Sequence, residues 1–178
     1  MLANLRYRTR QVFDAAFGVA ATAVALVAIQ PERNSQASSE TEDRNKATIQ
    51  ASFDAWRAGT GTPYDLLAPD ARWTIEGFSI VSKTYPTKEH FTREVVRPFN
   101  ARMLSPLKPK VRSLYADGDT VIAFFSARGV ARDGKPYANT YAWFLEMRGG
   151  QIIRASAFFD AIEFNELWTR VAPATGTN

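Results

Sequence analysis

Three polar side chains that together could form an acid-base site occur in neighbouring strand-like runs of the sequence: the guanidinium of Arg128, the amide of Asn139 and the carboxylate of Asp160. The dipeptides Asp133-Gly134 and Gly149-Gly150 separate these runs and are typical of two-residue hairpin turns. Counting outward from the two turns places Arg128 opposite Asn139, and Asn139 opposite Asp160. Because directly opposed residues share one face of a sheet, the count predicts a row of cation, amide and acid.

An acid in such a row can move a proton at a carbon atom beside a carbonyl group. We therefore expect Asp160 to be a general acid or base, with Arg128 orienting it or binding a substrate oxyanion. The alternative is structural: Asp160 forms an ion pair with Arg128 at the strand ends, or Arg128 is a solvent-exposed arginine.

The same count places aromatic residues next to this row, as the cross-strand sets Ser126–Tyr141–Phe158 and Phe124–Trp143–Ser156. The Tyr141 hydroxyl is a candidate donor to a carbonyl oxygen, which makes it a third candidate catalytic residue. Core packing alone would also explain these rings. The candidate substrate-binding residues are Asn139, Trp143, Phe158 and Phe124 from the strands, and Trp56, Tyr64, Trp73 and Phe91 from the N-terminal half. His90 is a candidate proton shuttle and Glu76 a candidate second carboxylate, although both are also typical of solvated positions.

The elements that must position these residues are helices followed by strands. Apolar residues at helical spacing predict helices over 45–58 and 86–103, the second with Thr87 as N-cap and an interruption or kink at Pro98. A short helical turn at 62–69 and a strand over 71–77 lie between them. Four strand-like runs with period-two alternation follow, and residues 161–171 are expected to form a closing helix. This order predicts an α+β fold with an antiparallel meander.

Both faces of the predicted sheet are largely apolar, which indicates that both are covered. The helices can cover one face. We expect the other, outer face to pack against a second copy of the chain in a two-fold homodimer.

Composition excludes several classes of site. The 178 residues include no cysteine and one histidine, so no metal site, disulfide or Ser-His-Asp triad is expected. No glycine-rich phosphate loop occurs and no cofactor is expected. The net charge of +4 comes from scattered residues rather than a dense basic cluster, so nucleic-acid binding is not expected.

Residues 1–37 form a separate segment. Three arginines precede a 15-residue apolar run at 15–29, which has the length of a signal-peptide core, and Ser35-Gln36-Ala37 has the form of a cleavage site. We expect an exported protein, periplasmic or secreted. The alternatives are an uncleaved inner-membrane anchor at residues 12–29, or an extension with no targeting role. Residues 38–45 are expected to be a disordered linker, 46–171 the folded domain and 172–178 a disordered tail.

Two stretches give the sequence a family resemblance: "DGDTVIAFFSARGVARDGKPYANTYAWFLEM" and "GGQIIRASAFFD" followed by "AIEFNELW". Together with "WTIEGFSIVSKTYPTKEHF", they resemble the SnoaL-like branch of the nuclear transport factor 2-like superfamily, which includes ketosteroid isomerases, polyketide cyclases and limonene epoxide hydrolase. The resemblance implies a cone-shaped curved antiparallel sheet wrapped around N-terminal helices, with a pocket at its open end. It also implies that Asp160 occupies the position of an acid on the last strand.

Three functions are compatible with these observations. The first is a pocket protein for a small apolar carbonyl or polycyclic compound, with isomerisation or cyclisation by proton transfer at Asp160. The second is a non-catalytic exported ligand-binding or dimeric assembly module whose pocket is filled by its own rings. The third is epoxide hydrolase-like activation of water.

Overall fold

A computed structural model describes residues 30–174 of the chain, with side chains described from residue 35. Its elements in order are α1 (Gln30–Ala58), η1 (Pro63–Leu66), β1 (Leu67–Ile75), β2 (Thr84–Tyr85), α2 (Lys88–Phe91), η2 (Thr92–Val96), α3 (Arg97–Asn100), β3 (Met103–Asp117), β4 (Thr120–Ala131), β5 (Pro136–Arg148), β6 (Gln151–Phe159) and α4 (Ala161–Arg170). The predicted α+β class and its order of helices before strands are confirmed. Strand β2 was not predicted, because two residues are too few to show alternation.

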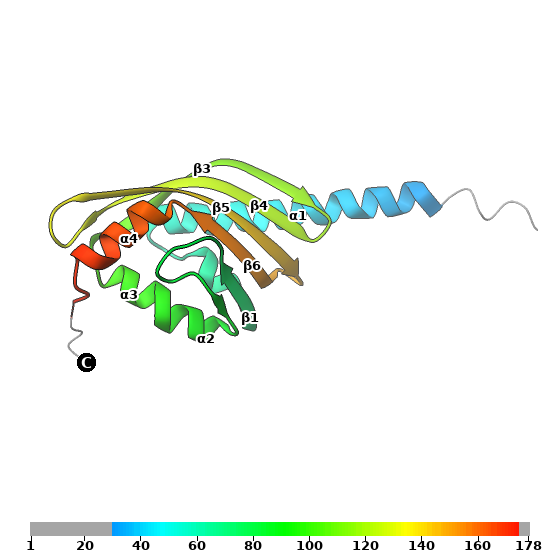
Figure 1. Ribbon diagram of the computed structural model, residues 1–178. Helices are drawn as coiled ribbons and strands as arrows, with labels where there is room; N and C mark the ends of the chain where they lie inside the picture. The colour runs from blue at the N-terminus through cyan, green and yellow to red at the C-terminus, as the bar shows by residue number, and fades with distance from the viewer. Residues whose placement is uncertain (1–29, 175–178) are drawn as a thin grey trace, which may run out of the picture.

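One curved six-stranded sheet, in the order β2-β1-β6-β5-β4-β3, forms the frame of the fold. Strands β3 to β6 form the predicted antiparallel meander, and β1 joins the edge of β6 in parallel. Figure 1 shows α1 running beneath β3 and β4, with α2 and α3 on the same, concave side. The sheet therefore has an inner face covered by helices and an outer face turned away from them.

Helix α1 is longer than the sequence pattern predicted. The expected disordered linker at 38–45 is wrong, since these residues are helical in α1. Contacts with the sheet explain the extension: Glu42 Oε1 accepts a hydrogen bond from the Gly118 backbone N–H at 3.0 Å, and Asn45 is buried. Further along the helix, Ile49 and Phe53 form the predicted apolar stripe and are buried in the core.

The expected signal peptide or anchor falls largely outside the described residues, including the apolar run at 15–29, and stays a prediction. Within residues 30–174, no helix combines the length and the apolar character needed to cross a bilayer. The C-terminal end of the described chain packs on the fold, because the Ala174 N–H donates to the Ala101 carbonyl at 2.8 Å.

Helix formation from Lys88 to Asn100 follows the prediction, and its irregular turn has a clear cause. Thr87 is the N-cap, and its Oγ1 accepts from the His90 N–H at 3.3 Å. Pro98 has no N–H for the carbonyl four residues earlier. The chain accommodates this with the π-helical turn η2, in which the Arg97 N–H bonds to Thr92 rather than to the residue four positions earlier.

The β4–β5 hairpin has a three-residue loop where a two-residue loop was predicted. The Ala131 N–H donates to Lys135 O at 2.9 Å, and Gly134 has a φ of 83°. The Asp133 carboxylate accepts from the Lys135 N–H at 3.1 Å, which stabilises the longer turn. Three-residue loops of this kind, with a glycine in the left-handed region, are the next most common hairpin connections.

A second register shift lies between β5 and β6. The Gly149-Gly150 turn has the predicted two residues, with φ of 58° and 79°, but a bulge between Glu146 and Met147 moves the remaining pairs by one. A one-residue shift moves a whole strand's side chains to the other face. The predicted row of Arg128, Asn139 and Asp160 and the two aromatic rows beside it are therefore wrong. The observed pairs that replace them are Ala127↔Asn139, Phe125↔Tyr141, Ala123↔Trp143, Tyr141↔Phe159 and Trp143↔Ala157.

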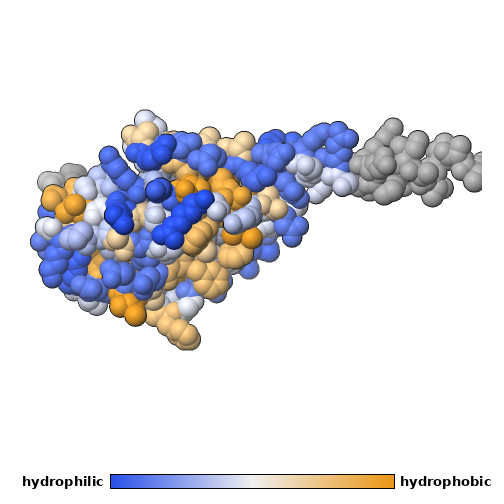
Figure 2. Space-filling model, turned by 90° about the horizontal axis from the view of Figure 1, so that it is seen from above, coloured by the Kyte–Doolittle hydropathy of each residue, from blue (hydrophilic) through white to orange (hydrophobic). Residues whose placement is uncertain are grey.

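The two faces of the sheet consequently differ from the predicted ones. The inner face carries the buried side chains of Phe125, Tyr141 and Trp143. The outer face carries a half-exposed aromatic group, defined here as Phe124, Phe144 and Phe158. The Arg112 guanidinium lies over the Phe124 ring at 5.0 Å, and the opposed cations Lys108 and Arg128 lie further along the same strands. Seen from above the sheet, strongly hydrophilic and hydrophobic residues lie next to one another on the surface (Figure 2).

Candidate functional site

A chamber with a volume of about 270 Å³ lies between the inner face of the sheet and the helices. Ligand pockets in proteins commonly have volumes of about 300–1,000 Å³, so the chamber is at the lower end of that range. Its lining is mainly aromatic and aliphatic, with a few polar groups. The lining residues are Trp56, Thr62, Tyr64, Asp65, Trp73, Ile75, Lys88, Phe91, Thr92, Val95, Val96, Phe99, Asn100, Leu107, Tyr141, Trp143, Ala157, Phe159 and Phe164.

Ring-on-ring packing fixes the floor of the chamber. Trp73 of β1 stacks on Phe91 of α2, with ring centroids 4.4 Å apart and planes within 10°. Trp143 of β5 meets Trp73 edge to face at 5.1 Å. Aromatic pairs of this geometry contribute about 0.5–1.5 kcal/mol beyond their buried area, so these walls are rigid.

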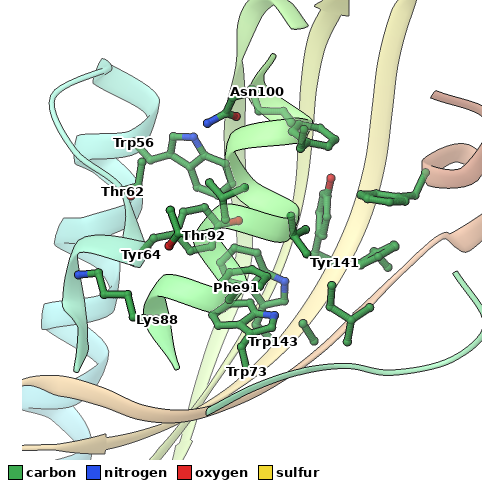
Figure 3. A pocket seen from close by; sticks show the side chains of 18 of the residues that line it. Trp56, Thr62, Tyr64, Trp73, Lys88, Phe91, Thr92, Asn100, Tyr141 and Trp143 are labelled. Atoms are coloured by element: carbon green, nitrogen blue, oxygen red, sulfur yellow. The ribbon is translucent and has the colours of Figure 1, made fainter. Parts of the chain in front are cut away.

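The helical side supplies the opposite wall. Trp56, near the end of α1, stacks on Trp143 with planes within 13° and centroids 6.1 Å apart. Tyr64 of η1 lies between the two tryptophans of the sheet, at 5.7 Å from each ring. Figure 3 shows these rings grouped around the chamber, with Lys88 and Asn100 at separate points of its rim.

Tyr141 brings a buried hydroxyl to the chamber and is connected to a hydrogen-bonded chain. Its oxygen lies 3.2 Å from the hydroxyl of Tyr137, and Asn139 Nδ2 donates to that Tyr137 hydroxyl at 3.0 Å. Tyr141 is 8% exposed, Tyr137 1% and Asn139 5%, so this series of hydrogen bonds is shielded from bulk water.

The orientation of the Asn139 amide is fixed by the backbone around it. Asn139 Oδ1 accepts from the N–H groups of Thr140 and Asp160, at 2.7 and 2.9 Å. Asn139 Nδ2 donates to the Asp160 carbonyl at 2.9 Å. An amide turned by 180° would face both N–H groups with a donor, so the nitrogen must point towards Tyr137.

This fixed amide gives the chain a direction. Among the described residues, the Tyr137 hydroxyl has two polar neighbours, Asn139 and Tyr141. Either hydroxyl could donate to the other, but Tyr141 lines the chamber and Tyr137 does not. Donation from Tyr137 to Tyr141 therefore avoids an enclosed proton without an acceptor, which would cost about 1–3 kcal/mol. The Tyr141 oxygen is then an acceptor, and its proton is free for an oxygen atom bound in the chamber.

Burial keeps this donor protonated. Desolvation, reinforced by the neighbouring Tyr137, raises the pKa of Tyr141 well above its ordinary value of 10.0. Burial also raises the pKa of Tyr137, although the hydrogen bond that its oxygen accepts from Asn139 partly opposes this. Tyr141 is thus a neutral hydroxyl donor throughout the physiological pH range.

The polar rim contains a carboxylate and an ammonium group that are both engaged in local structure. Asp65 Oδ2 accepts from the Thr62 N–H at 2.7 Å and closes the capping box of η1. Lys88 Nζ donates to the carbonyls of Asp65 and Leu67, at 3.3 and 3.2 Å. Within the described chain, Asp65 is the one carboxylate that lines the chamber.

Two of the three predicted catalytic residues lie outside this chamber. Asp160 is exposed and is the N-cap of α4: its Oδ1 accepts from the N–H of Ile162 at 2.9 Å. The strand thus ends on an acid because a helix starts there. Arg128 is exposed on the outer face opposite Lys108, so it does not reach Asp160 as predicted.

Six predicted residues are brought together at the chamber, although their roles in binding or catalysis stay predictions. They are Trp56, Tyr64, Trp73, Phe91, Tyr141 and Trp143. The predicted placement of Phe124 and Phe158 in the pocket is wrong, because the register shifts put both on the outer face. Asn139 does not line the chamber but is linked to it through its hydrogen bond to the Tyr137 hydroxyl. Glu76 is not among the lining residues. His90 holds the Thr87 hydroxyl at 2.7 Å from its Nδ1, within the N-terminal turn of α2.

Sequence reasoning missed the part of the site formed by the irregular helix and by β6. Lys88, Thr92, Val95 and Phe99 line the chamber with helical spacing of four, three and four, a signal present in the sequence. Phe159 of β6 was missed because the predicted register puts its neighbour Phe158 on the pocket face, and successive strand residues point to opposite faces. In residues 30–174, no group of three or more histidine or acidic side chains could hold a metal ion.

Comparison with known proteins agrees with this architecture. The family model described as "SnoaL-like domain" matches residues 49–155. No curated protein sequence matches the chain significantly.

Three similar solved structures illustrate the shared fold. An NTF2-like protein from Burkholderia thailandensis E264 has a TM-score of 0.57 and 21% identity, covering 69% of this chain and 95% of its own. A putative SnoaL-like polyketide cyclase from Jannaschia sp. CCS1 has a TM-score of 0.58 and 18% identity, covering 73% and 94%. TerC, co-crystallised with polyporic acid, has a TM-score of 0.57 and 20% identity, covering 70% and 98%. At these identities the likeness concerns the fold.

Proposed function

This chain belongs to the SnoaL-like domain family, and we propose that it binds a neutral, largely apolar carbonyl compound in the chamber, with Tyr141 donating a hydrogen bond to the carbonyl oxygen. The observation that carries the proposal is the directed chain from Asn139 through Tyr137, which leaves the Tyr141 proton available. The aromatic walls supply the apolar contacts, and the hydroxyl supplies orientation.

The size and charge of the chamber narrow the ligand class. A volume of about 270 Å³ favours a compound of one to three rings over a four-ring one. The inner part of the chamber is lined by apolar rings and a neutral hydroxyl, and its charged residues lie at the rim. The part of the ligand that binds inside should therefore be neutral.

A hydrogen bond from Tyr141 would also favour chemistry at the carbonyl. Negative charge develops on a carbonyl oxygen when a proton leaves the adjacent carbon, and a preorganised donor stabilises that charge. Isomerisation or cyclisation by proton transfer, the chemistry suggested by the family's polyketide cyclases and ketosteroid isomerases, is the proposed reaction class. The proton that leaves the carbon needs an acceptor, and Asp65, the one carboxylate among the described lining residues, is the candidate base. Asp160 as its base is not favoured by the geometry, because the carboxylate caps α4 instead.

Homodimer formation through the outer face is part of the proposal. Phe144 and Phe158 are 39% and 47% exposed and contact each other edge to face with centroids 6.1 Å apart. Exposed aromatic groups of this kind mark interaction surfaces. A two-fold dimer would pair this aromatic group with itself and leave the cations at the margin.

Ligand titration tests the binding proposal directly. Trp56, Trp73 and Trp143 line the chamber, so a bound bicyclic ketone such as tetralone should quench their fluorescence in a saturable manner. A chamber closed by its own side chains would give no saturable quenching. That result would support the alternative, a non-catalytic assembly module.

A further inference from the structure

A second hollow, which is partly open to solvent, adjoins the chamber. This groove has a volume of about 530 Å³ and runs between the end of α1 and the start of β3. Its own lining residues are Gly59, Gly61, Met103, Leu104 and Pro106, and it shares Trp56, Thr62, Asn100 and Leu107 with the chamber. The four shared residues place the two hollows side by side.

The groove is apolar and partly open to solvent. Met103 and Leu107 form its buried base, at 9% and 6% exposure, and Leu104 forms its rim at 66% exposure. None of the nine described residues that line it carries a charge. A surface of this kind fits an aliphatic chain better than a peptide or a charged group, which would lose hydration without gaining a partner.

Two side chains mark the junction between chamber and groove. Figure 3 shows Asn100 beside Trp56 at one end of the group of chamber side chains. The Trp56 ring is held against Trp143 and therefore forms a wall of both hollows. Asn100 is exposed, and its amide could donate to or accept from a polar linkage passing through the junction.

We propose that the groove is a second subsite, and that the ligand consists of a ring system in the chamber joined to an apolar aliphatic chain in the groove. The proposal rests on the function proposed above and extends it to a ligand class: alkyl-substituted or acyl-substituted cyclic carbonyl compounds. The position of the groove next to the chamber identifies the occupant, because a substituent that leaves the ring past Trp56 and Asn100 would lie along the groove.

The test compares two probes that differ only in the chain: tetralone, and tetralone carrying an n-alkyl chain of about six carbons. Since each buried methylene adds to affinity, the alkylated probe should bind the native protein roughly tenfold tighter or more. In Leu104→Gln this gain should fall by severalfold, while tetralone itself should bind as before. Ile162→Gln is the matched control, because Ile162 is also an exposed aliphatic residue, at 78%, and lies on α4 away from the groove.

The possible results separate the two proposals. Tetralone binding with no gain from the alkyl chain would overturn the groove as a subsite and leave the chamber intact. A gain that persists equally in Leu104→Gln would also overturn it, because the chain would then lie elsewhere. Absence of binding by both probes would overturn the proposed function and the subsite together.

Discussion

The hydroxyl oxygens of Tyr137 and Tyr141 lie 3.2 Å apart on the inner face of the sheet; Tyr137 is buried against Phe99, and Tyr141 lines the chamber. This contact connects the fold to the proposed chemistry. Asn139 holds the β6–α4 junction through its amide and, with the same nitrogen, fixes the proton of Tyr137. A structural hydrogen bond thereby determines the direction in which a buried tyrosine donates.

The substitution Tyr137→Phe should weaken ketone binding without changing the volume of the chamber. Tyr141 would lose the hydrogen bond that its oxygen accepts, which polarises its hydroxyl, so the hydrogen bond that it donates to the ligand would weaken. We expect a severalfold loss of tetralone affinity, within the roughly 0.5–1.5 kcal/mol of one neutral hydrogen bond. Fluorescence titration measures this change. Tetralin, the same rings without the carbonyl, should bind the variant and the native protein alike.

Removal of the Asn139 side chain should destabilise the fold. Asn139→Leu leaves the Asp160 N–H and carbonyl without their partners, and we expect the free energy of unfolding to fall by about 1–3 kcal/mol. Urea denaturation measures the loss. Asn139→Asp is the matched control: it keeps an acceptor for the two backbone N–H groups but cannot donate to Tyr137, so it should lose ketone selectivity as well as part of the stability.

The acid that ends β6 should contribute to stability rather than to ligand binding. Asp160→Ala removes the N-cap of α4 and should lower the free energy of unfolding by about 0.5–2 kcal/mol. Asp160→Asn preserves capping and should restore most of the loss. Tetralone affinity should be unchanged in both variants. Loss of affinity or of turnover in Asp160→Asn at normal stability would instead support the acid-base role predicted from the sequence.

Alkaline pH should reduce stability through the buried hydroxyl. The pKa of Tyr141 is raised above its ordinary value of 10.0, so the unfolded chain releases this proton at lower pH than the folded protein does. Its contribution is therefore complete below about pH 10 and is lost progressively as the pH rises above that value. Urea denaturation at about pH 9 and about pH 11 should show a smaller decrease for Tyr141→Phe than for the native protein. Equal decreases would mean that Tyr141 is not shielded.

The outer-face aromatic group should hold the proposed homodimer. Phe158→Glu places a charge in the centre of that group and should yield a monomer in light scattering after size exclusion. Phe78→Glu is the control, because Phe78 is 97% exposed on the loop between β1 and β2. A native protein that is monomeric at all concentrations would contradict the dimer.

Local sequence patterns were sufficient for the elements of this fold, but not for their register. Thr87, the helical stripe through Phe53 and the alternating strands each reflect interactions within a few residues, so they can be read from spacing. The length of the Asp133-Gly134 loop and the bulge beside Glu146 depend on how whole strands pack, and each changes the register by one residue. These two shifts moved Phe124 and Phe158 out of the predicted site and brought in Phe159.

The aromatic residues of the chamber were more predictable than its polar ones. Large aromatic side chains such as Trp73 and Trp143 are usually buried on whichever face of the sheet they lie, so their burial can be predicted without the register. Arg128 and Asp160 can be satisfied at the surface or at a helix terminus, so their place depends on the register and on the start of α4. Tyr137 was missed because its importance comes from its partners, Asn139 and Tyr141, rather than from its own spacing.

The central claim is that Tyr141 donates a hydrogen bond to a carbonyl oxygen in the chamber, and a four-way comparison of affinities tests it most directly. Tetralone and tetralin are titrated against the native protein and against Tyr141→Phe, with tryptophan fluorescence as the signal. The account predicts that the native protein prefers the ketone by roughly two- to twelvefold, after allowance for the compounds' different solubilities, and that Tyr141→Phe loses this preference while still binding tetralin. An equal preference for the ketone in both proteins would contradict it.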